Sequence, residues 1–434
     1  MKKVFVQSFG CRASQADGAG IESSLEQRGF EAVSESGHAD LVILNTCTVT
    51  SSADSDARQM VRRVHRQNPL AHILVTGCFA QRSPEEIAAL EGVTWVVGNS
   101  HKTKIADIVA SAAQNEDYHG EVFVSDIGRT QEFLAAPVVD AYGDRTRPNL
   151  KVQDGCSNKC SFCIIPSVRG RSRSAPLASV IDQIRALAEQ YREVVLSGIN
   201  LGRWGRDLPG DLRFVDLLRL TLLETSVERI RVSSVEPMDW STDLLELVAG
   251  ECRIAKHVHI PLQSGSDAVL KRMFRKYRTR HYASRLELAV KVMPDAAIGA
   301  DVMTGFPGET EREFEETVRF IEDQPFTYLH VFTYSERPGT LAATSLDQVP
   351  VDVRRERTRV LRDLSSRKLR SFQARMVGRV LSAVTLNKHT ALSSNFLRID
   401  LSSPREANRI VDVEIGGLTG ANLQERQLLP VLLS

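Results

Sequence analysis

The sequence lacks long apolar runs and a strong net charge. None of its 434 residues lie in a stretch that approaches the roughly 18 uninterrupted apolar residues of a membrane span. The N-terminus, MKKVFVQSFG, has too short an apolar run for a secretory signal. A net charge of +1 neither demands nor excludes a polyanionic partner. We therefore expect no membrane association and a reducing, cytoplasmic location, where cysteines serve as metal or redox ligands rather than as disulfides.

The composition is that of a globular chain with more than one core. Hydrophobic residues make up 42% and charged residues 25% of a chain that is too long for one ordinary core. Residues 1–115 alternate between strand and helix patterns, which predicts a parallel sheet with helices on its faces. Residues 116–147 are more polar and irregular, and we interpret them as a linker.

The second half of the chain predicts two further units. Strand and helix patterns alternate again over residues 148–370, which favours a full or partial (β/α) barrel with its chemistry at the carboxyl ends of the strands. Residues 371–434 show short strand-like runs around turns, which indicates a small β-barrel. The predicted fold class is therefore α/β, with a parallel sheet domain, a barrel and a C-terminal β-barrel module.

Three cysteines lie close together in VQDGCSNKCSFC, namely Cys156, Cys160 and Cys163. A zinc ribbon is the alternative, but no second pair of Cys or His lies near enough to complete a tetrahedral zinc site. Three thiolates on a [4Fe–4S] cube leave one iron without a protein ligand. The cluster follows the first strand of the predicted barrel, where a substrate site belongs. The missing fourth cysteine therefore indicates an open iron that a small molecule can bind.

A second set of cysteines follows three successive strands of the N-terminal domain: Cys11, Cys47 and Cys78. Successive parallel strands end on the same edge of a sheet, so these thiols should converge there. A buried structural role is the alternative for any one of them. Three cysteines at equivalent points of three units favour a second iron–sulfur cluster. Cys252 has no partner in either pattern, and we expect it to be a small core residue.

Several motifs resemble the radical S-adenosylmethionine methylthiotransferases: SFGCRASQADG, NTCTVT, TGCFAQ, DGCSNKCSFCIIPSVRGRSRS, HIPLQSGSDAVLKRM and FPGET. The resemblance covers nearly the whole chain and implies a C-terminal module of the TRAM type. NTCTVT is similar to the subgroup that acts on threonylcarbamoyl-adenosine next to the tRNA anticodon. Sister groups modify isopentenyl-adenosine in tRNA or an aspartate of a ribosomal protein. The opening departs from the commoner LGCKxNQ form at Phe9, Arg12, Ala13 and Ser14.

The resemblance implies the chemistry. Position 2 of adenine carries a carbon–hydrogen bond that acid–base catalysis cannot break at neutral pH, so a cofactor radical is needed. The cluster on Cys156, Cys160 and Cys163 would split S-adenosylmethionine and release a 5′-deoxyadenosyl radical. The cluster on Cys11, Cys47 and Cys78 would hold the sulfur atom, methylated by a first S-adenosylmethionine. An electron donor of the flavodoxin or ferredoxin type is implied, and the sulfur source is left open.

Other residues are candidates for binding S-adenosylmethionine. Phe162 resembles the aromatic residue that borders the adenine in this superfamily, and the small residues around Gly198 and Asn200 would let the backbone approach the methionine end. Further candidates are polar residues at the ends of predicted strands: Ser234, Glu236, Gln263 and Asp301. Each could instead be a strand cap or a loop residue.

Basic residues suggest an RNA surface. Arg354 to Arg375 contains nine Lys or Arg against two acids, and 271–280 is also basic. Either run could be a solvated helix face, but phosphate contacts by such residues would supply affinity for tRNA. The candidate contacts are Arg169, Arg171, Arg173, Arg367, Lys368 and Arg370. A tRNA methylthiotransferase is the favoured function, and a non-catalytic iron–sulfur RNA-binding protein is the rival from another class.

Overall fold

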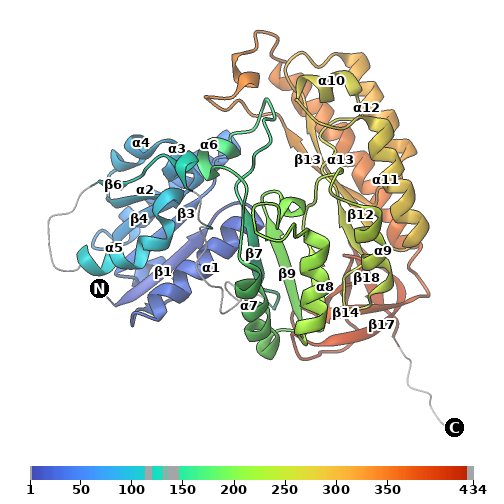
Figure 1. Cartoon of the computed structure of the whole chain (residues 1–434), viewed down its shortest axis with the longest axis horizontal. Helices are drawn as coiled ribbons and strands as arrows, with labels where there is room; N and C mark the ends of the chain where they lie inside the picture. Colours follow the sequence, from blue (N-terminus) through green and yellow to red (C-terminus); the bar gives the residue numbers. More distant parts are fainter. Residues whose placement is uncertain (1, 113–119, 131–132, 134–145, 428–434) are drawn as a thin grey trace.

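The computed structural model describes residues 2–112, 120–130, 133 and 146–427. Six parallel strands form the N-terminal sheet (Figure 1), in the order β2-β1-β3-β4-β5-β6. Their bounds are β1 Lys3–Ser8, β2 Glu31–Ala32, β3 Leu41–Thr46, β4 His72–Gly77, β5 Val93–Gly98 and β6 Glu121–Phe123. The helices are α1 Arg12–Glu26, α2 Ser51–Gln67, α3 Cys78–Arg82, α4 Pro84–Ala88 and α5 Ile105–Ala112.

The residues of β3 explain why helices cover both faces of this sheet. Every residue of β3 is buried. Val42 and Leu44 pack with α2, α3 and α4 on one face, whereas Leu41 and Ile43 pack with α1 and α5 on the other. Successive side chains of a strand point to opposite faces, so a continuous apolar strand needs a cover on each side.

The N-terminal sheet extends into the segment that the sequence predicted to be a linker. Glu121–Phe123 form β6, which pairs in parallel with β5. Part of that linker is therefore a sheet edge, and the prediction was wrong for these residues. The short, mixed stretch EVF carries no strand period of its own, so its strand depends on the neighbouring β5. Residues 134–145, also assigned to the linker, lie outside the described residues.

Six parallel strands form a partial barrel in the middle of the chain. Their order is β7, β9, β10, β11, β12 and β13; two bridges, Ile230 with Ile254 and Ser234 with His259, link β10 to β11. The strands are β7 Asn149–Asp154, β9 Glu193–Gly198, β10 Arg229–Val232, β11 His257–His259, β12 Ala297–Thr304 and β13 Tyr328–Thr333, with the short antiparallel β8 Arg173–Ser174 beside β7. This architecture confirms the predicted α/β barrel class.

The barrel helices alternate with its strands. They are α6 Ile165–Arg169, α7 Leu177–Gln190, α8 Phe214–Glu224, α9 Thr242–Gly250, α10 Asp267–Arg272, α11 Thr279–Val292, α12 Glu311–Asp323 and α13 Val351–Ala374. Short 3-10 helices lie at Ser36–His38, Asn99–Lys104, Ile127–Arg129, Leu201–Arg203 and Leu341–Thr344. Within the described part of the chain, no helix combines the length and the apolar character that crossing a membrane requires.

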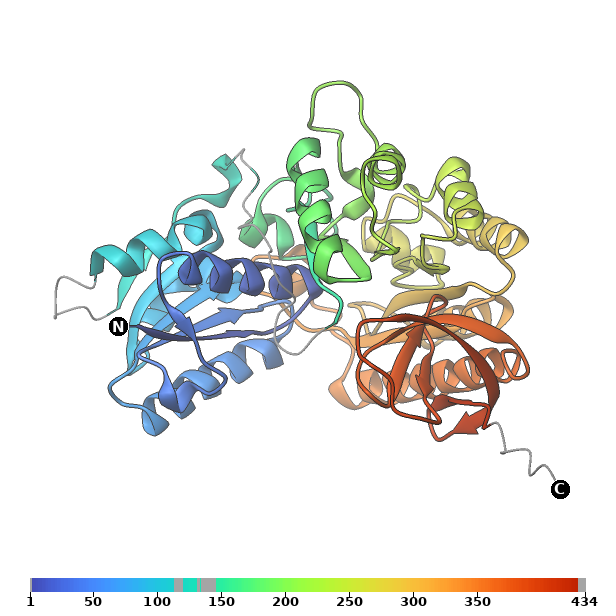
Figure 2. The same ribbon diagram turned by 90° about the horizontal axis from the view of Figure 1, so that it is seen from below.

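A closed five-stranded barrel ends the described chain (Figure 2), as the sequence predicted. Its strands are β14 Val380–Thr385, β15 Thr390–Ser393, β16 Arg398–Asp400, β17 Ile410–Thr419 and β18 Asn422–Glu425. Its core includes Phe372 and Met376 from the end of α13, and Ala297 from the start of β12. The helix therefore passes the predicted boundary at residue 370 and joins the two barrels. The C-terminal barrel packs where the central strands begin, away from their carboxyl ends.

Candidate functional site

The N-terminal cysteines lie at the carboxyl ends of three neighbouring strands. Cys11 follows β1 and caps α1, Cys47 follows β3, and Cys78 is the first residue of α3 after β4. Because β1, β3 and β4 are adjacent in the sheet, the fold brings the three thiols to one edge, as their spacing predicted. Cys47 and Cys78 are buried, and Cys11 is exposed.

Close approach at this edge requires a glycine before Cys11. Gly10 has a φ of +100°, and a Cβ atom there would lie 2.7 Å from Cys47 Cβ and 3.0 Å from its Sγ. Any other residue would be strained in this conformation and would push Cys47 away. Burial, together with the nearby thiols of Cys78 and Cys11, raises the pKa of Cys47 to about 12. A thiol of this kind becomes a thiolate when a metal replaces its proton.

The spread of the sulfurs distinguishes a cluster from a single ion. Among the described residues, the sulfurs of neither cysteine set all lie within 4.8 Å of one another. Each sulfur on a zinc ion lies about 2.3 Å from the metal, so all ligands of one ion would fall within that limit. The donor sets, three cysteines each, therefore fit a larger iron–sulfur cube better than zinc.

Arg169 joins the two domains beside Cys78. Its guanidinium donates from Nε to Cys78 Sγ at 3.3 Å, from Nη1 to Asp154 Oδ1 at 2.9 Å and from Nη2 to Asp17 Oδ2 at 3.0 Å. Only 1% of Arg169 is exposed. The prediction that Arg169 contacts RNA was therefore wrong, because the side chain is buried and donates hydrogen bonds to buried partners. Arg173 is also buried and donates to the Arg169 carbonyl at 2.6 Å, whereas Arg171 is exposed.

Two lysines complete this buried charge network. Lys102 Nζ lies 2.8 Å from Asp17, and Lys151 Nζ contacts both Asp17 and Asp154. Burial alone would raise the pKa of Asp17, but Lys102, Lys151 and Arg169 lower it to about 2. The network therefore holds two carboxylates and three cations, and the excess positive charge faces Cys78.

The second cysteine set lies on one loop after β7. Cys156 Sγ accepts from the Asn158 backbone N–H at 3.4 Å and lies 3.6 Å from Asn200 Nδ2. Arg275 Nη1 donates to Cys160 Sγ at 3.3 Å. Burial raises the pKa of Cys163 to about 12. All three side chains are partly exposed, whereas the N-terminal set combines one exposed and two buried cysteines.

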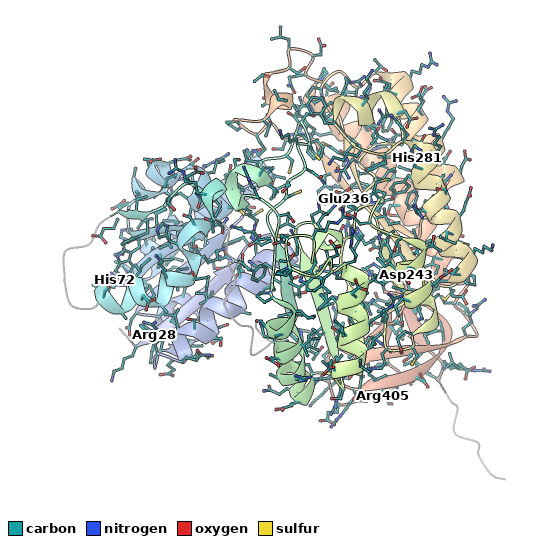
Figure 3. The ribbon with its side chains drawn as sticks, viewed as in Figure 1. Arg28, His72, Glu236, Asp243, His281 and Arg405 are labelled. Carbon is teal, nitrogen blue, oxygen red and sulfur yellow. The ribbon has the colours of Figure 1, made fainter. Side chains whose placement is uncertain are left out.

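Arg275 is a site residue that the sequence did not single out. It belongs to the basic run 271–280, which suggested a polyanion surface, yet it is 8% exposed and pairs with Glu236. It also donates to Tyr277 Oη at 3.0 Å. Glu236 lies in the middle of the molecule, between β9 and β12 (Figure 3). The predicted cofactor residue Glu236 therefore reaches the cysteine loop through Arg275.

A cavity of about 250 Å³ lies beside Cys163 and against the segment that follows Cys47. Val49 and Thr50, directly after Cys47, line one side of it. From the barrel it is lined by Phe162, Cys163, Ile164, Ile165, Gln263, Asp301, Met303, Phe332, Thr333, Tyr334 and Ser335. The structure therefore brings together three predicted cofactor residues, Phe162, Gln263 and Asp301, in one space with Cys163. A planar ligand in this cavity would touch both domains.

The remaining predicted cofactor residues lie around this cavity rather than in its lining. Ser234 Oγ lies 3.0 Å from His259 Nδ1, inside the barrel. Asn200 lies beside Cys156, and a Cβ at Gly198 would lie 3.0 Å from the side chain of Gln153. Asn200 and Gly198 thus border the cysteine loop, while Ser234 belongs to the barrel interior.

Comparisons with known proteins show the family of this chain. Residues 150–321 match the Radical SAM superfamily, and residues 3–98 match the uncharacterized protein family UPF0004. The chain is 36% identical to the threonylcarbamoyladenosine tRNA methylthiotransferase MtaB of Aquifex aeolicus, over 95% of this chain and 100% of that protein. It is 40% identical to the Bacillus subtilis protein of the same name, over 88% and 85% of the two chains.

This chain belongs to the radical S-adenosylmethionine methylthiotransferase family. A relative with another substrate in its name, the tRNA-2-methylthio-N(6)-dimethylallyladenosine synthase of Syntrophotalea carbinolica, is 34% identical over 88% of this chain and 87% of its own. Among solved structures, the radical S-adenosylmethionine methyltransferase TsrM of Kitasatospora setae matches with a TM-score of 0.57 and 16% identity, over 79% and 77% of the two chains, which shows the fold alone. Membership in the methylthiotransferase family implies S-adenosylmethionine and a [4Fe–4S] cluster.

The basic residues of this methylthiotransferase divide into exposed and packed groups. Arg367 and Arg370 are exposed on α13. Lys368 instead donates to the carbonyls of Glu322 and Gln324, at 3.0 and 2.8 Å, and thereby holds α13 against the end of α12. As a direct RNA contact Lys368 was a wrong prediction, because its ammonium is already bonded. Arg354 and Arg357 in the same run are buried.

Cys252 is exposed, so the expectation of a small core residue was also wrong. Its Sγ lies 3.5 Å from Glu251 Oε1, in the turn after α9. The sequence offered no apolar period at this position, and absence from the two cysteine patterns is not evidence of burial. Cys252 is therefore a surface thiol apart from both sites.

Proposed function

We propose that this protein is a tRNA methylthiotransferase that modifies position 2 of threonylcarbamoyl-adenosine next to the anticodon. The observation that carries the proposal is the cavity lined by Val49 and Thr50 on one side and by Cys163 and Asp301 on the other. A base placed there would lie beside Cys163 and against the segment that directly follows Cys47. The family and the names of its relatives support the reaction and the substrate.

In this proposal each cysteine set holds one [4Fe–4S] cluster, with Cys11, Cys47 and Cys78 on one and Cys156, Cys160 and Cys163 on the other. When bound, the clusters and S-adenosylmethionine supply the radical that takes hydrogen from the base and the methylthio group that replaces it. Arg169 and Arg275 each donate to one ligand sulfur, which stabilises the negative charge of the thiolates.

The residues of the cavity position the substrates. Phe162 packs edge to face on Phe306, with ring centroids 6.5 Å apart, and would fix the adenine of S-adenosylmethionine. Asn200, Gly198 and Glu236 would surround its methionine end, while Ser234 and Gln263 offer polar groups to the remainder. Exposed Phe332 and partly buried Met303 offer apolar surface to the substrate base.

The remaining parts of the proposal concern partners and location. Residues 1–115 would form the sulfur-carrying domain, 148–370 the radical domain, and 371–434 a TRAM-like module that grips tRNA together with Arg171, Arg367 and Arg370. A flavodoxin or ferredoxin type protein would deliver the electron. All of this requires a reducing compartment with tRNA, which is the cytoplasm in a bacterium.

The test is an anaerobic assay with reconstituted protein, S-adenosylmethionine, a reductant and added sulfide. Transfer RNA that carries threonylcarbamoyl-adenosine should gain a methylthio group, detected as a mass increase in the digested nucleoside. Transfer RNA with dimethylallyl-adenosine should gain little. If only the dimethylallyl substrate or a ribosomal protein gained sulfur, the assigned substrate would be wrong. If S-adenosylmethionine were not cleaved, the assigned enzyme class would be wrong.

A further inference from the structure

The interior of the central barrel carries polar and aromatic side chains beyond the cavity. Asp301, which lines the cavity, lies 3.2 Å from His330 Nδ1 and 3.4 Å from His259 Nε2. The His330 ring is 5.2 Å from both the His259 and the Tyr328 rings. These side chains come from β11, β12 and β13, and they form a continuous line of polar and aromatic groups from the cavity lining toward the beginning of the strands.

This line of side chains ends at a group of arginine, glutamate and aromatic residues, which we call the floor. Glu193 on β9 accepts from Arg231 Nε at 2.7 Å and Nη2 at 3.2 Å, and from Arg147 Nη1 at 3.3 Å. Phe396 from the C-terminal barrel closes the floor, stacked on His257 with centroids 4.3 Å apart. Arg231 packs against the same Phe396 ring, with its guanidinium carbon 5.5 Å from the centroid.

Arg12 adds a third guanidinium to this floor. It enters from the start of α1, with its guanidinium carbon 5.9 Å from the Phe396 ring centroid, and it interacts electrostatically with Arg147, Arg231 and Glu193. Within the ranges that the structure describes, the Arg12 side chain makes no ion pair and no hydrogen bond. Glu193 is already shared by two arginines, so the floor carries positive charge that no described carboxylate balances.

An unbalanced, partly buried guanidinium is costly unless an anion joins it. Its place beside the sulfur-carrying edge restricts what that anion can be. The residue follows Cys11 directly, and its guanidinium lies beside the Phe396 ring. Asp301, which lines the cavity, is linked to the floor by contacts through His330, Tyr328 and Phe396. A substituent on a base held in the cavity would extend along these side chains toward Arg12. The phosphates of the RNA backbone would remain outside the cavity.

We propose that Arg12 binds the carboxylate of the threonylcarbamoyl group and so selects the substrate nucleoside. This inference rests on the proposed function, because it assumes that the base lies in the cavity. The hydroxyl and amide groups of the same substituent would form hydrogen bonds with His330 and Asp301. Dimethylallyl-adenosine carries no charge and would leave Arg12 unpaired, and sites with buried polar groups strongly reject such analogues.

The test compares two short anticodon stem-loop RNAs that differ in one charge. One carries threonylcarbamoyl-adenosine and the other its carboxyl methyl ester, and KM and kcat for methylthiolation are measured for each. The wild-type KM for the acid should be lower than that for the ester by at least about tenfold, since a desolvated charge pair is lost in the ester. Equal wild-type values would overturn the proposal without any variant.

Variants then assign the effect to Arg12. Arg12→Gln should raise the KM for the acid at least about tenfold and leave the KM for the ester unchanged, so that the preference disappears. Arg12→Lys should keep part of the preference because it keeps the charge. Arg219→Gln, a charge removed from the exposed face of α8, is the matched control and should alter neither value.

Two outcomes contradict the role of Arg12. An equal rise for acid and ester would mean that Arg12 contacts an RNA phosphate or supports packing, and an unchanged acid KM would mean that the carboxylate binds elsewhere. Iron content and urea midpoint, measured for each variant, separate these results from misfolding. Failure of the proposed function has a different signature, because the wild-type protein would then modify neither RNA.

Discussion

The two cysteine sites are built in opposite ways. The barrel set comes from one loop within Cys156–Cys163, whereas the N-terminal set comes from the ends of three strands. The loop site takes its cation, Arg275, from its own domain. The sheet site takes Arg169 from the other domain, next to the loop. The sheet site therefore has its arginine partner only when the two domains are packed together, whereas the loop site has its arginine partner within the barrel domain.

The largest effect should come from removing each set in turn. Wild-type protein reconstituted without oxygen should hold about eight iron atoms, and replacing either set of three cysteines with Ala should leave about four. Both triple variants should lose methylthiolation entirely. Loss of the loop set should also abolish S-adenosylmethionine cleavage, whereas loss of the sheet set should leave some cleavage. A triple variant that retained all its iron would break the comparison.

The next effect concerns the charge network that only the sheet site possesses. Asp17→Asn removes one of two carboxylates from three buried cations, and we expect it to cost about 3–5 kcal/mol of unfolding free energy. The urea midpoint of the apoprotein measures this change. Glu224→Gln, in the exposed pair with Arg185, is the control and should cost less than about 1 kcal/mol. Equal effects would mean that the network does not hold the domains together.

The same network gives the sheet site a pH dependence in acid. The folded pKa of Asp17 is about 2, below the unfolded value of about 3.9. A lowered folded pKa stabilises the folded state fully above the unfolded value, and this contribution is lost as the pH falls from about 4 toward 2. Urea midpoints of wild-type apoprotein should fall over this range more steeply than those of Asp17→Asn. Parallel curves would show that Asp17 does not titrate this way.

A smaller effect is expected on the outside of the barrel. Reversing Arg367 and Arg370 to Glu should weaken tRNA binding about tenfold and flatten the dependence of log Kd on log salt, since phosphate contacts become repulsions. Lys368→Met should instead lower the urea midpoint and leave the salt slope unchanged, because its ammonium caps carbonyls of α12. Filter binding at several salt concentrations distinguishes these outcomes. If the reversal changed nothing, the RNA grip would lie elsewhere, for example near Arg171.

The smallest effect should come from the seventh cysteine. Cys252→Ser should change neither iron content nor activity, and stability should shift by no more than about 0.5 kcal/mol, because the side chain is exposed. Iron analysis beside the triple variants provides the comparison. A loss of iron in this variant would show that the division into two sets of three is incomplete.

Much of the fold could be predicted from local pattern. Alternating apolar strands and helices gave β1, β3, β4 and β5 and the six barrel strands, because each pattern reflects burial on known faces. The loop cysteines needed only their spacing. The sheet cysteines needed the rule that parallel strands end together, which is a property of the fold rather than of the residues between them.

Several of the errors concern charged residues whose partners are distant in sequence. Arg169 looked like an exposed RNA contact, but its partner Asp17 lies 152 positions earlier and only the packed domains bring them together. Arg275 and Lys368 were read as part of basic runs, and each is bonded across the fold. A run of basic residues gives the charge of a segment, but it does not give the direction in which each side chain points.

Phe396 connects the C-terminal barrel to the central barrel, which limits how freely this module can be exchanged in evolution or engineering. A separate C-terminal module could be exchanged between relatives without touching catalysis, but here one aromatic ring of that module is stacked on His257 of the central barrel. If Arg12 binds the substituent as proposed, replacing the module would also replace an aromatic ring beside that site. A chimaera that carried a relative's C-terminal barrel would inherit some of its nucleoside preference along with its grip on RNA.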